Sequence, residues 1–130
     1  MRPSWVEVDL DAIRHNVRQI REAVDPAKFC AVVKADGYGH GDVPVAEAAL
    51  EAGADWLAVA TVTEGLRLRE AGVEAPVLLL SEATDTDVPA IIANRLTPTV
   101  YSDGFLSCLL YTSPSPRDER RYLVCRLLLE

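Results

Sequence analysis

The sequence predicts an α/β fold in which helices cover a parallel sheet. Short apolar runs alternate with segments of helical periodicity, and successive runs begin about 20 to 28 residues apart. The runs are continuously apolar, as in parallel strands that are buried on both faces. Their spacing leaves room for one helix between consecutive strands. These observations alone do not distinguish an open, doubly wound sheet from part of a closed barrel.

The first segment of the chain predicts a strand and then a helix. Residues 5–10 alternate apolar and acidic side chains, which is typical of a short, half-exposed strand. Asp9 or Asp11 can cap the helix, and Asp25 with Pro26 ends it. The helix is indicated by apolar residues at intervals of three and four: Leu10, Ile13, Val17, Ile20 and Val24.

Helices and buried strands alternate along the rest of the first hundred residues. A helix over residues 43–52 should end at Gly53, a helix capped by Thr63 should follow, and a further one should start at Asp85 or Asp87. The expected buried strands are residues 29–33, 56–60, 77–80 and 98–101.

Composition excludes several classes of protein. The chain has 130 residues, enough for one domain but far fewer than the ~250 of a closed eight-stranded α/β barrel. A formal net charge of -7 with only two lysines offers no electrostatic footprint for nucleic acid or an anionic membrane. No apolar run reaches the ~20 residues of a membrane-spanning helix. The acidic residues near the N-terminus interrupt any signal peptide, so we expect a cytoplasmic protein. Three cysteines without CxxC spacing predict neither a disulfide framework nor a metal site.

Lys34 is the main candidate for chemistry. It closes the apolar run 29–33, and the glycine-rich residues 37–41 follow it. A lysine is costly to bury as a cation, and it becomes a nucleophile or a base when its pKa falls from ~10.4 toward neutrality. Lysines that form Schiff bases with pyridoxal phosphate (PLP) are the general precedent.

Residues 31–41, AVVKADGYGHG, closely resemble the PLP-attachment motif of the alanine racemase family. The resemblance begins at residues 2–10, continues through residues 51–60 and 96–102, and fades near Leu106. The motif is long and ungapped, and the match is therefore specific.

The resemblance implies a fold and an activity. The family has an (α/β)8 TIM-type barrel followed by a β-rich domain. Residues 1–106 would then be a partial barrel of about the first four βα units, without the C-terminal β domain. The full-length enzyme would be a homodimer that interconverts L-alanine and D-alanine and supplies D-alanine for peptidoglycan.

The resemblance also implies roles for single residues. Lys34 would hold PLP as a Schiff base and then act as one of two catalytic bases. Tyr38 would contact the phosphate of PLP. Asp36 and His40 are expected to support the loop, because the family pattern assigns them no proton transfer. The glycines are expected to let the backbone turn tightly beside the cofactor, and a phosphate cradle at the start of the next helix is the alternative.

Other groups of the family's site have no matching position here. The second base is a tyrosine from the partner subunit's C-terminal domain, and further phosphate ligands and an arginine at the pyridine nitrogen come from later strands. We therefore expect the chain to be inactive as a racemase on its own.

Residues 107–130 do not continue the pattern. Residues 1–107 contain 9 basic and 17 acidic residues, whereas residues 108–130 contain 4 and 3. The segment includes Pro114-Ser115-Pro116 and looks like translated adapter sequence at a break in a gene. We expect a non-native or disordered tail after residue 106, with a divergent natural linker as the alternative.

Two other functions stay open. A non-catalytic PLP-binding barrel protein of cofactor homeostasis would share the lysine, but such proteins lack the run at residues 37–41. A nucleotide-binding α/β module would use the glycines for phosphate, but the chain has neither a P-loop ending nor a GxGxxG fingerprint.

Overall fold

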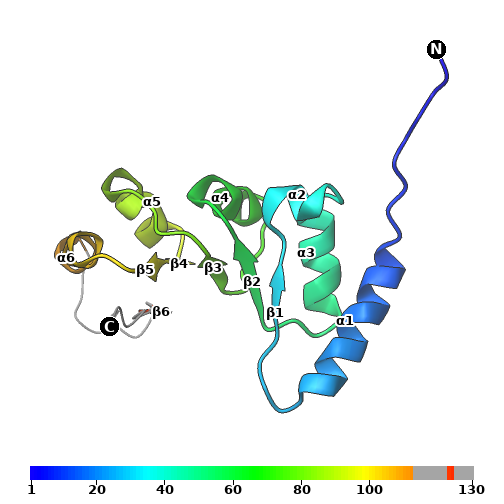
Figure 1. Cartoon of the computed structure of the whole chain (residues 1–130), viewed down its shortest axis with the longest axis horizontal. Helices are drawn as coiled ribbons and strands as arrows, with labels where there is room; N and C mark the ends of the chain where they lie inside the picture. Colours follow the sequence, from blue (N-terminus) through cyan, green and yellow to red (C-terminus); the bar gives the residue numbers. More distant parts are fainter. Residues whose placement is uncertain (113–122, 125–130) are drawn as a thin grey trace.

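The computed structural model describes residues 1–112 and 123–124 of the chain (Figure 1). Its main feature is a four-stranded parallel sheet in the order β1-β2-β3-β4. Each crossover moves one strand onward, whereas a doubly wound sheet reverses its strand order at a switch point. The sheet is therefore the first part of a barrel, as expected. Its strands are Cys30–Val32 (β1), Trp56–Val59 (β2), Val77–Leu79 (β3) and Leu96–Thr97 (β4).

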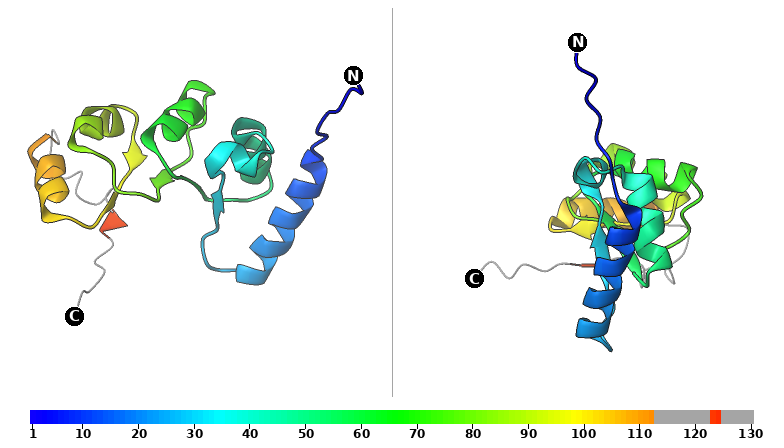
Figure 2. Two further views of the ribbon diagram at one scale, coloured as in Figure 1. Left: turned by 45° about the horizontal axis from the view of Figure 1, so that its top comes forward. Right: turned by 90° about the vertical axis from the view of Figure 1, so that its right-hand side faces the viewer.

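Helices connect these strands, and Figure 2 shows α3, α4 and α5 on the same side of the sheet. A second pair of parallel strands follows β4, in which β5 (Thr99–Val100) pairs with β6 (Leu123–Val124). The helical elements are α1 (Leu10–Val24), α2 (Lys34–Tyr38), α3 (Asp42–Glu51), α4 (Val62–Glu70), the 3-10 turn η1 (Asp85–Asp87), α5 (Val88–Ala93) and α6 (Asp103–Thr112).

The two faces of the sheet have different surroundings. One face packs against the helices and forms the core, in which Leu57, Val59, Val77 and Leu79 are fully buried with Leu68 of α4. Alternate residues lie on the other face, and the register places Val32, Ala58, Leu78 and Thr97 in one row across it. Val32 is 40% exposed. This second face is the one that a closed barrel would turn inward.

The strand predicted at residues 5–10 is wrong. Residues 1–8 form an extended arm that points away from the body (Figure 1), and Trp5 is 77% exposed. Alternating apolar and polar residues show only that a segment could pair with a sheet edge. None of the described strands pairs with residues 5–10. The helix prediction is confirmed, because α1 starts at Leu10 and Asp9 Oδ1 accepts the amides of Asp11 and Ala12.

Two further boundaries differ from the prediction. The cap of α4 is Thr61 rather than Thr63, because Thr61 has a glutamate three residues later and the pair forms a capping box. The strand expected at residues 98–101 is only partly confirmed, because β5 covers Thr99–Val100 while the strand that pairs with β3 is β4, at Leu96–Thr97. Pro98 lies between them, and proline has no amide to donate to a strand neighbour.

Helix α6 crosses the boundary that was expected after residue 106 and continues to Thr112. Most of the predicted tail lies outside the described residues, so the boundary stays a prediction. Among the helices of the described part of the chain, none is long and apolar enough to cross a membrane.

Candidate functional site

Lys34 lies at the C-terminal end of β1, directly after the last strand residues. The amide of Val33, which is buried, donates to the carbonyl of Ala58 at 2.8 Å and extends the pairing with β2. Lys34 itself is half-buried, and within residues 1–112 its ammonium takes part in no salt bridge. Active sites of barrels lie at this end of the strands. The sheet therefore fixes the backbone from which the Lys34 side chain extends.

The residues after Lys34 form a left-handed helical turn. The φ angles are 51° at Ala35, 55° at Asp36, 60° at Gly37, 57° at Tyr38 and 85° at Gly39. A residue with a Cβ atom loses about 1–2 kcal/mol in this conformation. The sequence predicted a tight glycine turn, but three of these five residues are not glycine. Surrounding contacts must therefore hold the turn.

Asp36 and His40 supply two of these contacts. Asp36 Oδ1 accepts the amide of Asp42 at 3.1 Å, and His40 Nδ1 lies 3.0 Å from the carbonyl oxygen of Gly37. Both side chains thus support the loop, as predicted. Gly37 is buried, and a Cβ atom there would lie 3.3 Å from the amide nitrogen of Asp42.

The amides of the turn do not form a phosphate cradle. The amide of Gly37 donates to the carbonyl of Val33 at 3.0 Å, and those of Gly39, His40 and Gly41 donate to backbone carbonyls within the turn at 2.9–3.1 Å. The amide at the start of α3 is occupied by Asp36. A bound phosphate would have to break these bonds, which argues against both the cradle and a nucleotide-binding role for the glycines.

Tyr38 projects from the turn and is 60% exposed. Among the hydrogen bonds of the described residues, none involves its hydroxyl group, which can therefore donate to a ligand. Val32 and Leu80, at the same end of β1 and β3, are also exposed. An amine, a phenol and two aliphatic side chains thus follow or end the strands at this end of the sheet.

Glu64 connects the lysine turn to the next βα unit, and the sequence analysis missed it. Its Oε1 accepts the amide of Ala35 at 2.8 Å, and its Oε2 accepts the amides of Ala60 at 2.7 Å and Thr61 at 3.0 Å. Partial burial opposes ionisation, but these amide bonds outweigh it and lower the pKa of the Glu64 carboxyl. The spacing of Thr61 and Glu64 in the sequence is a capping-box signal, whereas no local sequence pattern indicates the bond from Ala35 to Glu64.

Glu82 forms a similar link one strand further along. Its carboxylate accepts the amides of Tyr101 at 2.6 Å and Ser102 at 2.9 Å, and its own amide donates to the Tyr101 hydroxyl at 2.8 Å. Although burial acts in the opposite direction, these bonds lower the pKa of the Glu82 carboxyl. Carboxylates thus tie neighbouring loops together at this end of the sheet.

Asp42 joins α3 to α4 behind the turn. Its side chain is buried, and Oδ2 lies 2.7 Å from Nε of Arg67, whose side chain is half-exposed. Oδ1 accepts the amide of Val43 at 2.8 Å. This ion pair fixes the start of α3, against which the turn packs.

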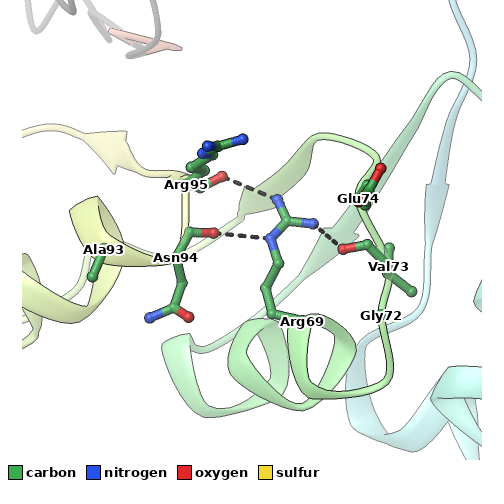
Figure 3. A pocket seen from close by; sticks show the side chains of 7 residues that line it. All are labelled: Arg69, Gly72, Val73, Glu74, Ala93, Asn94 and Arg95. Atoms are coloured by element: carbon green, nitrogen blue, oxygen red, sulfur yellow. Dashed lines mark hydrogen bonds between the residues drawn. The ribbon is translucent and has the colours of Figure 1, made fainter.

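A separate cavity of about 530 Å³ lies at the opposite, N-terminal end of the strands (Figure 3). Its central side chain is Arg69, whose guanidinium donates to four backbone carbonyls at 2.7–3.0 Å, those of Val73, Ala75, Asn94 and Arg95. Burial and the charge of Arg95 lower the pKa of Arg69. Four of the five N–H donors of Arg69 are used by the protein itself, and features at this end of a barrel generally serve stability.

Comparison with known proteins relates this geometry to one family. The family model described as alanine racemase, N-terminal domain, matches residues 8–113. The alanine racemase of Symbiobacterium thermophilum is 49% identical over 106 residues, which are 82% of this chain and 28% of that protein. The alanine racemase of Synechocystis is 55% identical over 101 residues, 76% of this chain and 27% of that protein.

Solved structures of alanine racemases also resemble this chain. The alanine racemase of Bacillus anthracis with bound L-Ala-P matches with a TM-score of 0.78 and 45% identity, over 82% of this chain and 28% of that one. The alanine racemase of Clostridium difficile matches with a TM-score of 0.79 and 38% identity, over 83% and 28%. The chain thus spans somewhat more than a quarter of the relatives that it matches. Because the family model matches residues 8–113 and the sheet has the topology of a barrel, this chain belongs to the family of the alanine racemase N-terminal domain.

Proposed function

We propose that this chain is the cofactor-binding part of an alanine racemase, an enzyme that interconverts L-alanine and D-alanine. The observation that carries the proposal is the place of Lys34, whose amine extends from the C-terminal end of β1 inside the sequence motif 31–41. Because the chain spans 28% of the length of a relative at 49% identity, racemisation is proposed for a protein of the relatives' length.

The residues at this site fit PLP. Lys34 offers an amine outside any ion pair in residues 1–112, which suits an aldehyde. Tyr38 offers an exposed hydroxyl four positions along the turn, which suits a phosphate oxygen. Both residues sit on a backbone that internal hydrogen bonds make rigid. Lys34 would thus hold the cofactor covalently, and Tyr38 would orient it.

PLP, when bound, supplies an electron sink that acidifies the Cα–H bond of an amino acid. Lys34 Nζ would accept the Cα proton on one face of the substrate and return it in the reverse reaction. Inversion requires a second acid on the opposite face. We assign that role, by the resemblance, to a tyrosine of the partner subunit in a homodimer.

A chimera tests the proposal at the level of activity. Residues 8–106 would replace the matching segment of the Bacillus anthracis enzyme, and D-alanine formation from L-alanine would be measured. We expect activity in the chimera, loss of activity in Lys34→Ala, and retention in Lys28→Ala. A folded chimera that binds PLP but forms no D-alanine would contradict the racemase assignment and would favour a non-catalytic PLP-binding protein.

A further inference from the structure

Glu64 reaches the lysine turn from the next βα unit. It is the third residue of α4, and its Oε2 accepts the amides of Ala60 and Thr61 at 2.7 and 3.0 Å. An ordinary capping box needs only this half of the carboxylate. The second oxygen, Oε1, accepts the amide of Ala35 at 2.8 Å across a separation of 29 residues. Glu64 therefore does more than cap its own helix.

The bond to Ala35 acts on the peptide group that carries Lys34. Ala35 follows Lys34 directly and is the first residue of the left-handed turn, with a φ of 51°. That conformation is unfavourable for a residue with a Cβ atom. A hydrogen bond to a carboxylate is stronger than one between neutral groups. Glu64 thus holds a strained peptide group in register with the end of β2.

We propose that Glu64 is a positioning residue for Lys34: its carboxylate bridges the amide of Ala35 and the amides at the end of β2, and so holds the backbone from which the reactive amine extends. The inference rests on the proposed function where it concerns the reaction of that amine with PLP. Glu64 acts through the backbone of Lys34 and Ala35. At neutral pH the carboxylate is ionised, and both of its oxygens are available as acceptors.

The decisive variant is Glu64→Gln, which keeps the length of the side chain. Its single carbonyl oxygen cannot serve both the two amides at the capping box and the amide of Ala35, because its NH2 group accepts no hydrogen bond, and we expect the oxygen to stay with the two amides of Ala60 and Thr61. The matched control is Thr61→Ala. It removes the hydroxyl that accepts the Glu64 amide at 3.3 Å, so it weakens the same helix start but leaves the bond to Ala35.

Each protein is mixed with PLP and reduced with borohydride after increasing times. The lysine amine condenses with the aldehyde and releases water, and hydride from borohydride then converts the carbon–nitrogen double bond into a stable secondary amine. Peptide mapping gives the pyridoxyl label on Lys34 relative to Lys28, the other lysine of the chain. Hydrogen exchange at the Ala35 amide is measured in parallel without PLP.

We expect Glu64→Gln to lower the Lys34-to-Lys28 labelling ratio and to speed exchange at Ala35, each by about tenfold, as for loss of one charge-assisted hydrogen bond. Thr61→Ala should leave both values near those of the wild type while its Tm falls. Unchanged labelling and exchange in Glu64→Gln would overturn the inference. A wild-type chain that labels both lysines equally would refute the proposed function instead. In that case, hydrogen exchange at the Ala35 amide of Glu64→Gln would test the role of Glu64 by itself. Lost protection in this variant would support the role, and retained protection would overturn it.

Discussion

Replacement of Gly37 by alanine gives a direct test of how the lysine turn is held. Gly37 has a φ of +60°, and a Cβ atom there would lie 3.3 Å from the nitrogen and 3.4 Å from the Cα of Asp42. The left-handed conformation alone destabilises an alanine by about 1–2 kcal/mol. The contact is with backbone at the start of α3, which cannot rotate away, and such overpacking adds about 1–3 kcal/mol.

Gly39→Ala is the matched control, because Gly39 also has a positive φ but has nothing within 4 Å of its Cβ position. The unfolded-state effect of replacing glycine by alanine is common to both variants. Gly37→Ala should therefore lower the free energy of unfolding by about 1–3 kcal/mol more than Gly39→Ala. Urea denaturation followed by circular dichroism measures this difference. Equal losses in the two variants would refute the close packing of the turn against α3.

Other predictions concern packing, ionisation and the ion pair of the buried Asp42 with Arg67. Gly65→Ala places a Cβ atom 3.0 Å from Leu96 Cδ1, and should lower the free energy of unfolding by about 1 kcal/mol, partly restored by Leu96→Val in the same chain; no recovery in the double variant would contradict this contact. The lowered pKa of Glu64 contributes stability that is present above its ordinary value of 4.5 and is lost as pH falls through the folded pKa. Urea denaturation at a series of pH values should therefore show that the free energy of unfolding falls less steeply with acid in Glu64→Gln than in the wild type. Identical pH profiles of the two proteins would argue against the amide bonds. Arg67→Ala leaves the buried carboxylate of Asp42 without its cation and should lower the free energy of unfolding by about 1–3 kcal/mol. Recovery of that stability in the double variant Arg67→Ala with Asp42→Asn would show that the unpaired charge is the cause.

Much of the scaffold could be predicted from the sequence. The strands at residues 30–32, 56–59 and 77–79 fall inside the predicted apolar runs, because a parallel strand buried by helices needs continuous apolar residues. Helix α1 was recognisable from its apolar stripe and from Asp9, whose carboxylate caps it. The strand predicted at residues 5–10 is wrong, because strand pairing depends on an available sheet edge and not on the segment alone.

The candidate site was less accessible to sequence reasoning. Lys34 and Tyr38 were found through the motif, and their roles stay predictions. The left-handed turn contradicts the local preference of Ala35, Asp36 and Tyr38, and one of the bonds that hold it comes from Glu64, 29 residues away. Glu64 was visible in the sequence only as half of a capping box. Its link to Ala35 exists because β1 and β2 are neighbours in the sheet, which no local pattern records.

The central claim is that Lys34 is the residue of this chain that holds PLP. The most direct test is peptide mapping of the wild-type chain after reduction with PLP and borohydride, beside Lys34→Arg. We predict a pyridoxyl label concentrated on Lys34, with little on Lys28, and loss of that concentrated label in Lys34→Arg. Equal labelling of the two lysines, or a label that persists elsewhere at the same level in Lys34→Arg, would contradict it.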